Sequence, residues 1–173
     1  MKREKLMSSR YVQVWFLACY MLIAMASALA EDKGLDVSVV LASGVGDKPI
    51  LRIVVQNRSN STLYLHEGNL PWSTSTGGMK LFAMRGENRE VQLEQLFAFD
   101  NPVDHIVVKP GSSIKGEIEL AERFPSLQQE RLTAEIVLFW THNSIAFMDK
   151  ALRNRVQHRD GGMLVIPKRT KFL

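Results

Sequence analysis

The chain has 173 residues, of which 46% are hydrophobic and 23% charged, and its formal net charge is +4. These values are typical of one globular domain and exclude a collagen-like repeat, a low-complexity chain and a disulfide-dense miniprotein. The single cysteine, Cys19, excludes an intramolecular disulfide and any metal site built from several thiolates.

Residues 1–30 have the pattern of a signal peptide. Basic residues precede an almost unbroken apolar run over residues 11–26, and Ala28, Leu29 and Ala30 follow it as a typical cleavage site. The run is shorter than the roughly 20 residues that a membrane-spanning helix needs. We therefore expect cleavage near Ala30 and a periplasmic or secreted protein, with an uncleaved anchor as the alternative.

The first part of the remaining chain shows apolar residues at every second position, interrupted by turn-forming residues. This pattern is typical of antiparallel strands. It predicts strands over residues 35–41, 51–55, 63–65 and 79–84. Residues 66–78 show no periodicity and are predicted to form a long loop.

The alternation continues after residue 104. A strand is predicted over residues 105–108, and Lys109-Pro110-Gly111 forms a turn before a strand over residues 114–120. Residues 134–140 are apolar on both faces, which predicts a central strand covered on both sides. Residues 31–143 are therefore predicted to form an all-β, immunoglobulin-like antiparallel β-sandwich, with a closed barrel as the alternative.

Residues 144–173 differ in composition. From Asp149 onward, seven Lys and Arg residues stand against two Asp. We expect a basic C-terminal extension with a short amphipathic helix within residues 144–161, a turn at Gly161-Gly162 and a last strand over residues 163–166. A solvated tail is the simpler interpretation, and contact with an acidic partner or weak contact with an anionic membrane surface is the alternative.

Several short motifs follow one another along residues 35–141. They are Asn57-Arg58-Ser59-Asn60, Leu70-Pro71-Trp72, Leu81-Phe82, Val107 to Ile114 and Gly116 to Leu120. Their order resembles two immunoglobulin-like groups, the pro-domains of deuterolysin-type metallopeptidases and the intracellular proteinase inhibitor domains of bacilli. This resemblance spans roughly residues 35–141. It implies a sandwich that packs against another protein, often a peptidase, and has no catalytic role of its own.

Catalytic motifs are sparse. The four histidines form no pair at the spacing typical of metal ligands, and no nucleophile elbow or phosphate-binding loop is present. His66 and Glu67 are the best local candidates for a metal-binding hydrolase, which we keep as an alternative hypothesis. Because these motifs are missing, we expect no enzyme activity, no cofactor and no metal. We also expect no nucleic-acid partner, because the region after residue 30 is nearly neutral.

The loop over residues 66–78 is the predicted binding site, since long loops in compact domains are often functional. Glu67, Leu70, Pro71 and Trp72 are the predicted partner-binding anchors. The alternative for Trp72 is that it closes one end of the sandwich.

Three arginines are expected to steer a partner electrostatically, namely Arg153, Arg155 and Arg159. The resulting hypothesis is an exported, non-catalytic protein-binding module that restrains a hydrolase or toxin. An envelope structural component is a further alternative.

Overall fold

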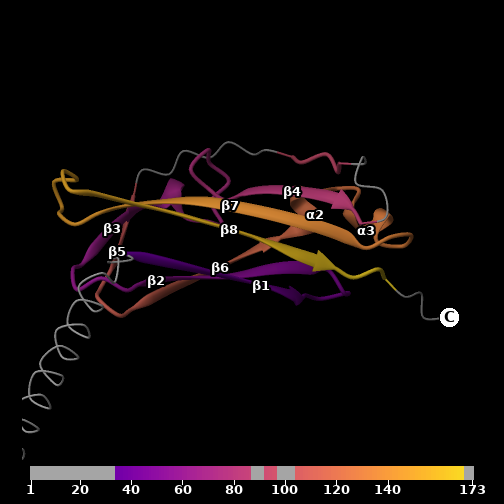
Figure 1. Cartoon of the computed structure of the whole chain (residues 1–173), viewed down its shortest axis with the longest axis horizontal. Coiled ribbons are helices and arrows are strands. Elements are labelled where there is room, and N and C mark those ends of the chain that lie inside the picture. The colour runs from indigo at the N-terminus through magenta and orange to yellow at the C-terminus, as the bar shows by residue number, and fades with distance from the viewer. Residues whose placement is uncertain (1–33, 87–91, 97–103, 170–173) are drawn as a thin grey trace, which may run out of the picture. The chain divides into compact units, whose positions relative to one another are not determined.

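The chain folds as an all-β sandwich of two antiparallel sheets (Figure 1). This computed structural model describes residues 34–86, 92–96 and 104–169. The predicted signal peptide lies outside these ranges, so its cleavage stays a prediction. No helix within the described ranges has the length and apolar character needed to cross a membrane.

The smaller sheet contains three strands. β1 (Leu35–Ser43), β2 (Pro49–Asn57) and β6 (Ser113–Glu119) lie in the order β1-β2-β6. Val55 lies opposite Val37 on β1 and opposite Ile114 on β6, so one face of all three strands is apolar.

The larger sheet is built around β7 (Ile136–Phe147). β8 (Arg155–Ile166) pairs with one edge of β7 along its whole length. The other edge is shared by β4 (Lys80–Arg85) and β3 (Leu63–His66), and β5 (His105–Val108) pairs with β3. β7 is therefore paired on both edges, which confirms the predicted central position of the strand over residues 134–140.

Alternation along the strands directs apolar side chains between the sheets. The buried cluster draws on both sheets and on the short segments between them. Its most enclosed members are Leu35, Leu51, Ile53, Val55, Leu63, Leu65, Leu120, Phe124, Leu127, Ile136, Leu138 and Ile166.

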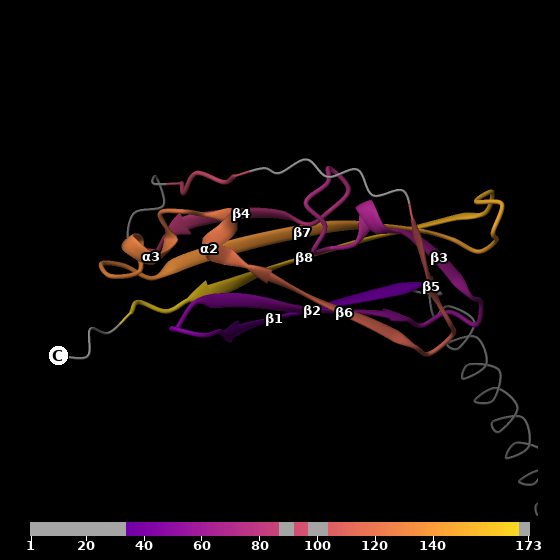
Figure 2. The same ribbon diagram turned by 180° about the vertical axis from the view of Figure 1, so that it is seen from behind.

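The two long sides of the sandwich are closed differently. On the β4/β6 side, the segment between β3 and β4 and two helical turns cover the gap, as Figure 2 shows from behind. These turns are α2 (Leu120–Arg123) and α3 (Leu127–Glu130), which the periodicity does not predict. On the opposite side, β1 and β8 run along the edges (Figure 1).

The expectation of a helical extension after residue 143 is wrong. Residues 144–147 complete β7, a turn follows, and β8 extends without a break from Arg155 to Ile166. Gly161 and Gly162 lie inside β8 and form no turn. The Trp140 indole occupies the space beside Gly162 where a Cβ would lie, so this region belongs to the larger sheet.

The prediction that both faces of the central strand are covered is also wrong. Phe139 lies on the outer face of β7 and is 42% exposed, whereas Leu138 faces the core and is fully buried. The outer face of the larger sheet is therefore apolar in part and open.

Candidate functional site

The segment between β3 and β4 is held against the sandwich by defined hydrogen bonds. It begins with η1 (Glu67–Asn69), where the Gly68 N–H donates to His66 Nδ1 at 3.0 Å. The carbonyl oxygen of Asn69 lies 2.9 Å from His142 Nε2 on β7. This contact fixes the segment above the stretch of β7 between its pairings with β4 and β3.

The structure places two of the predicted anchors in the interior. Leu70 is only 4% exposed and belongs to the core cluster, and Pro71 is also buried. Neither side chain can contact a partner in this conformation, because both already pack against the sandwich. Glu67 is half-buried within η1.

Trp72 is partly buried and packs against the core from the β6 side. Its indole occupies the space beside Gly116 where a Cβ would lie, so a side chain at position 116 would overlap the ring. This arrangement favours the alternative in which Trp72 closes the sandwich between its two sheets.

The three predicted steering arginines are exposed but separate. Arg153 lies in the turn after β7, and Arg155 begins β8, where its Nη2 donates to Gln157 Oε1 at 2.7 Å. Arg159 lines a hollow of about 470 Å³ together with Asn69 and Lys80. Arg159 therefore lies next to the predicted binding loop, since both line this hollow. Arg153 and Arg155 do not line it.

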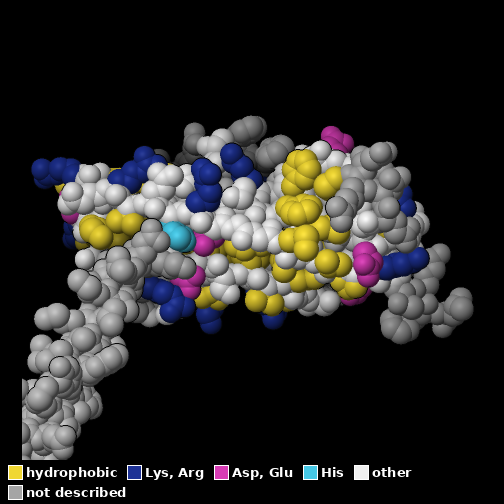
Figure 3. Space-filling view, viewed as in Figure 1, with side chains coloured by type: hydrophobic (Ala, Val, Ile, Leu, Met, Phe, Trp, Pro, Cys, Tyr) yellow, Lys and Arg dark blue, Asp and Glu magenta, His cyan; other side chains and the backbone are white. Residues whose placement is uncertain are grey.

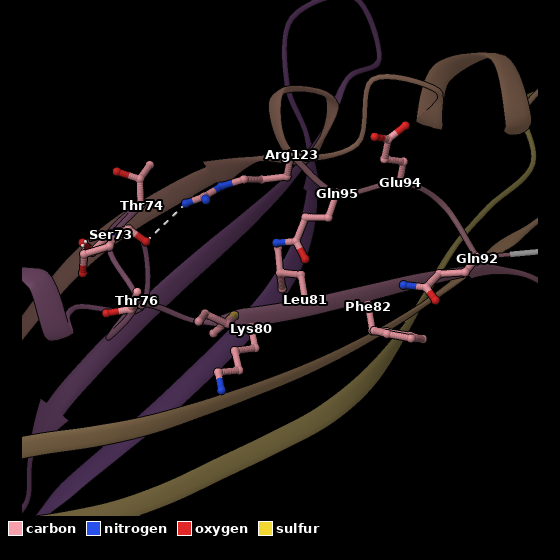
Figure 4. A pocket seen from close by; sticks show the side chains of 13 residues that line it. Ser73, Thr74, Thr76, Lys80, Leu81, Phe82, Gln92, Glu94, Gln95 and Arg123 are labelled. Atoms are coloured by element: carbon pink, nitrogen blue, oxygen red, sulfur yellow. Dashed lines mark hydrogen bonds between the residues drawn. The ribbon is translucent and has the colours of Figure 1, made fainter. Parts of the chain in front are cut away.

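A larger groove of about 610 Å³ runs beside β4 (Figure 4). Met79, Leu81 and Phe82 form its apolar wall. Its polar lining residues are Ser73, Thr74, Ser75, Thr76, Lys80, Gln92, Glu94, Gln95 and Arg123. A concave, mostly apolar site with a few polar groups is typical of ligand-binding surfaces.

The groove lies along the edge of β4 that faces away from β7. The Leu93 N–H donates to the Ala83 carbonyl at 2.9 Å, so the Ala83 backbone is directed away from β7. Backbone direction alternates along an antiparallel strand, and Leu81 is therefore directed away from β7 as well. Its N–H and C=O face the groove and can bind an amide group.

Arg123 supplies a positive charge in this groove in addition to Lys80. Its Nη2 donates to the Ser73 carbonyl at 3.2 Å, as the dashed line in Figure 4 shows. Burial lowers the pKa of the Arg123 guanidinium below its ordinary value, and neighbouring Glu122 opposes this shift. A guanidinium has five N–H donors, so Arg123 can hold an anionic or carbonyl group in addition to Ser73.

An exposed apolar patch lies next to the groove on the outer face of the larger sheet. Register places Phe82, Phe139 and Met163 in one row across β4, β7 and β8, and Met84, Val137 and Val165 in the next row. Phe82, Phe139, Met163 and Val165 are 46%, 42%, 60% and 47% exposed. We call these six residues the outer-face patch, and Phe82 joins it to the groove.

The inner face of the β7–β8 hairpin carries a polar cluster. Ser144 Oγ lies 2.9 Å from His142 Nδ1, and His158 Nε2 lies 3.1 Å from Asp160 Oδ1. Because the Asn69 carbonyl can only accept, His142 carries its proton on Nε2 and accepts from Ser144 through Nδ1. Burial lowers the pKa of His142, against smaller opposing effects of Asn69 and Asp160.

This polar cluster contains the residue types of a catalytic site, but a substrate cannot reach its serine and histidine in this conformation. Ser144 and His142 are 1% and 2% exposed. Neither residue lines the groove or the hollow. The geometry is suited to holding the segment between β3 and β4 on β7.

The structure places a second histidine, His105, next to the alternative metal site at His66 and Glu67. His66 lies opposite His105 in the β3–β5 register, and their ring centroids are 5.0 Å apart. Within the described ranges, no group of three or more His, Cys, Asp or Glu side chains is placed to hold a metal ion. The two imidazole rings of His66 and His105 therefore do not form a complete set of metal ligands with the other described residues.

Sequence reasoning missed both the groove and the outer-face patch. Arg123 reaches the groove from a helical turn distant in the sequence, and no local motif marks it. The patch did carry a signal, because Phe82 and Phe139 occupy the outward phase of predicted strands, where polar residues are expected.

No protein-family model matches the chain, and no curated protein matches it. A solved structure described as a protein from Archaeoglobus fulgidus aligns with 80% of this chain and 98% of its own. The identity is 9% and the TM-score is 0.38. The resemblance to the pro-domains and inhibitor domains stays a prediction.

Proposed function

We propose that the chain is a non-catalytic protein-binding module whose partner packs on the outer-face patch. The observation that carries this proposal is the row of exposed apolar side chains across three adjacent strands, with Phe139 between Phe82 and Met163. Contiguous exposed apolar surface is typical of interaction sites, and aromatic residues are enriched at the centres of interfaces.

The surroundings of the patch support a protein partner. The groove beside β4 adds the Leu81 backbone and the Arg123 guanidinium, which can bind main-chain amides or a carboxylate. Lys80 lines both the groove and the hollow, Arg159 lines the hollow, and these two cations favour a partner with an acidic rim. Export to the periplasm and restraint of a hydrolase or toxin stay predictions from the sequence.

The test is affinity capture with the tagged full-length chain expressed in its own host. We compare the wild type with the double variant Phe82→Ser/Phe139→Ser, and proteins are measured by quantitative mass spectrometry. The variant is expected to lose the proteins that the wild type enriches. The aromatic pair contributes only about 0.2 to 1 kcal/mol to stability at an exposed cross-strand position, so the fold should persist.

Val45→Ser is the matched control, because Val45 is 94% exposed and lies in the turn between β1 and β2, outside the patch. It should enrich the same proteins as the wild type. Retention of the full set by the patch variant would contradict the proposal.

A further inference from the structure

The second edge of β8 presents unpaired backbone groups. The Met148 N–H donates to the Asn154 carbonyl at 2.9 Å, which sets the hydrogen-bonding phase of the β7–β8 ladder. Even-numbered residues of β8 therefore bond to β7, and odd-numbered residues direct their N–H and C=O groups away from it. No backbone partner for these outward groups lies within the described parts of the chain.

The two halves of this edge differ in how strongly their side chains discourage pairing with another strand. Charged residues discourage strand pairing at exposed edges, and the first half carries Arg155, Arg159 and Asp160. The second half, Gly161–Ile166, carries no charge. Figure 3 shows hydrophobic side chains gathered over this end of the hairpin and Lys and Arg side chains toward the β7–β8 turn.

We propose that β8 pairs antiparallel with β8 of a second copy of this chain, about a twofold axis at Gly161. An identical antiparallel strand offers matching donors and acceptors, and a twofold contact closes without further growth. An axis perpendicular to the sheet pairs residues of the same face, so residues of like parity lie opposite each other.

Charge selects the register. An axis at Asp160 would place the two Asp160 carboxylates directly opposite each other, and an axis at Arg159 would do the same for two guanidinium groups. An axis at Gly161 places Arg159 opposite Met163 of the second copy and Asp160 opposite Gly162. Axes closer to the end of β8 also separate the charges, but they shorten the ladder.

The paired assembly has a defined consequence for the surface. The two five-stranded sheets become continuous, and both outer-face patches lie on the same side of the joint sheet. The proposal rests on the outward backbone groups of β8 and does not depend on the proposed function, which rests on the side chains of the outer-face patch, Met163 and Val165 among them.

The first test is the mass of the purified protein in solution by sedimentation equilibrium at about 100 µM. The wild type is expected to be a dimer. Met163→Pro should give a monomer, because residue 163 directs its N–H away from β7 and proline removes only that outer donor. Met163→Ala keeps the donor and should remain a dimer.

The second test measures the register by disulfide formation. In a Cys19→Ser background, Gly161→Cys should form an intermolecular disulfide on mild oxidation, since the two residues lie opposite each other. Met163→Cys is the matched control and should stay reduced, because it faces Arg159 of the second copy. Circular dichroism verifies that each variant is folded.

A monomeric wild type at this concentration would overturn the proposal. This holds also if β8 then proves to pair with a strand from another protein. Cross-linking of Met163→Cys in place of Gly161→Cys would overturn the register. Loss of dimer in Met163→Ala would show that the side chain, and not the edge backbone, makes the contact.

Discussion

Trp72 and Gly116 form a complementary pair that lies between the two sheets. The indole covers the glycine, and both residues contribute to closing the β4/β6 side of the sandwich. Because the ring is partly buried against the core, its removal leaves a cavity that the neighbouring segments fill only in part.

We expect Trp72→Ala to lower the free energy of unfolding by about 2 to 4 kcal/mol. Gly116→Ala should also destabilise the wild type, because its methyl group overlaps the indole, but it should cost far less in the Trp72→Ala background. Urea denaturation of the four proteins in the double-mutant cycle measures this coupling. Unchanged stability of Trp72→Ala would instead favour a role as an exposed anchor.

His142 makes the stability of the molecule depend on pH. Burial lowers its pKa in the folded protein below the ordinary value of 6.5, although Asp160 on the opposite strand, itself paired with His158, reduces the shift. As the pH falls below about 6.5, the unfolded chain takes up a proton that the folded protein resists. Stability is therefore full above this pH and declines below it.

The prediction is that His142→Gln flattens the dependence of unfolding free energy on pH between about 5 and 7. Glutamine retains an N–H donor for the Asn69 carbonyl. Chemical denaturation at a series of pH values measures the slope. An equal slope in the wild type and the variant would show that another group controls the dependence.

At the scale of elements, the β7–β8 hairpin shows where sequence patterning succeeds and fails. Alternation predicted β1, β2 and β6 because their inward positions are aliphatic and their outward positions are mostly polar. In the second half of β7, the inward residues His142 and Ser144 are polar and the outward Ile145 is apolar. The side chains still alternate between the two faces there, but the inward positions are polar and an outward position is apolar.

The same effect hides the first half of β8. Its inward positions include His158 and Asp160, which hydrogen-bond to each other, and the next inward residue, Gly162 at the start of the second half, makes room for the Trp140 indole. The mixture of apolar and basic residues before residue 161 therefore predicts an amphipathic helix, and Gly161-Gly162 predicts a turn. Only pairing with β7 reveals that these residues form one strand.

At the scale of the whole molecule, Arg131 connects the two sheets. It is buried, and its Nη1 donates to the Asp47 carbonyl at 2.9 Å in the β1–β2 turn. Its Nε donates to the Pro167 carbonyl at 3.2 Å, just after β8. One guanidinium thereby links the turn of the smaller sheet to the end of the larger one.

We expect Arg131→Met to lower the free energy of unfolding by about 2 to 3 kcal/mol, because hydrogen bonds to a charged group are lost and two carbonyls lose a donor. Arg52→Met is the control. Arg52 pairs with Glu117 at 3.0 Å on an exposed face, and such surface pairs contribute at most about 1 kcal/mol. Urea midpoints decide the comparison, and equal losses in the two variants would contradict the linking role.

The sequence by itself determined the all-β class, most strand positions and the long segment between β3 and β4, because alternation and turn residues are local properties of the chain. The tertiary structure decided which side chains face outward together. Leu70 and Pro71 are buried against the sandwich, whereas Phe82, Phe139 and Met163 on three separate strands form one surface. Strand register, which depends on contacts between distant residues, creates that surface.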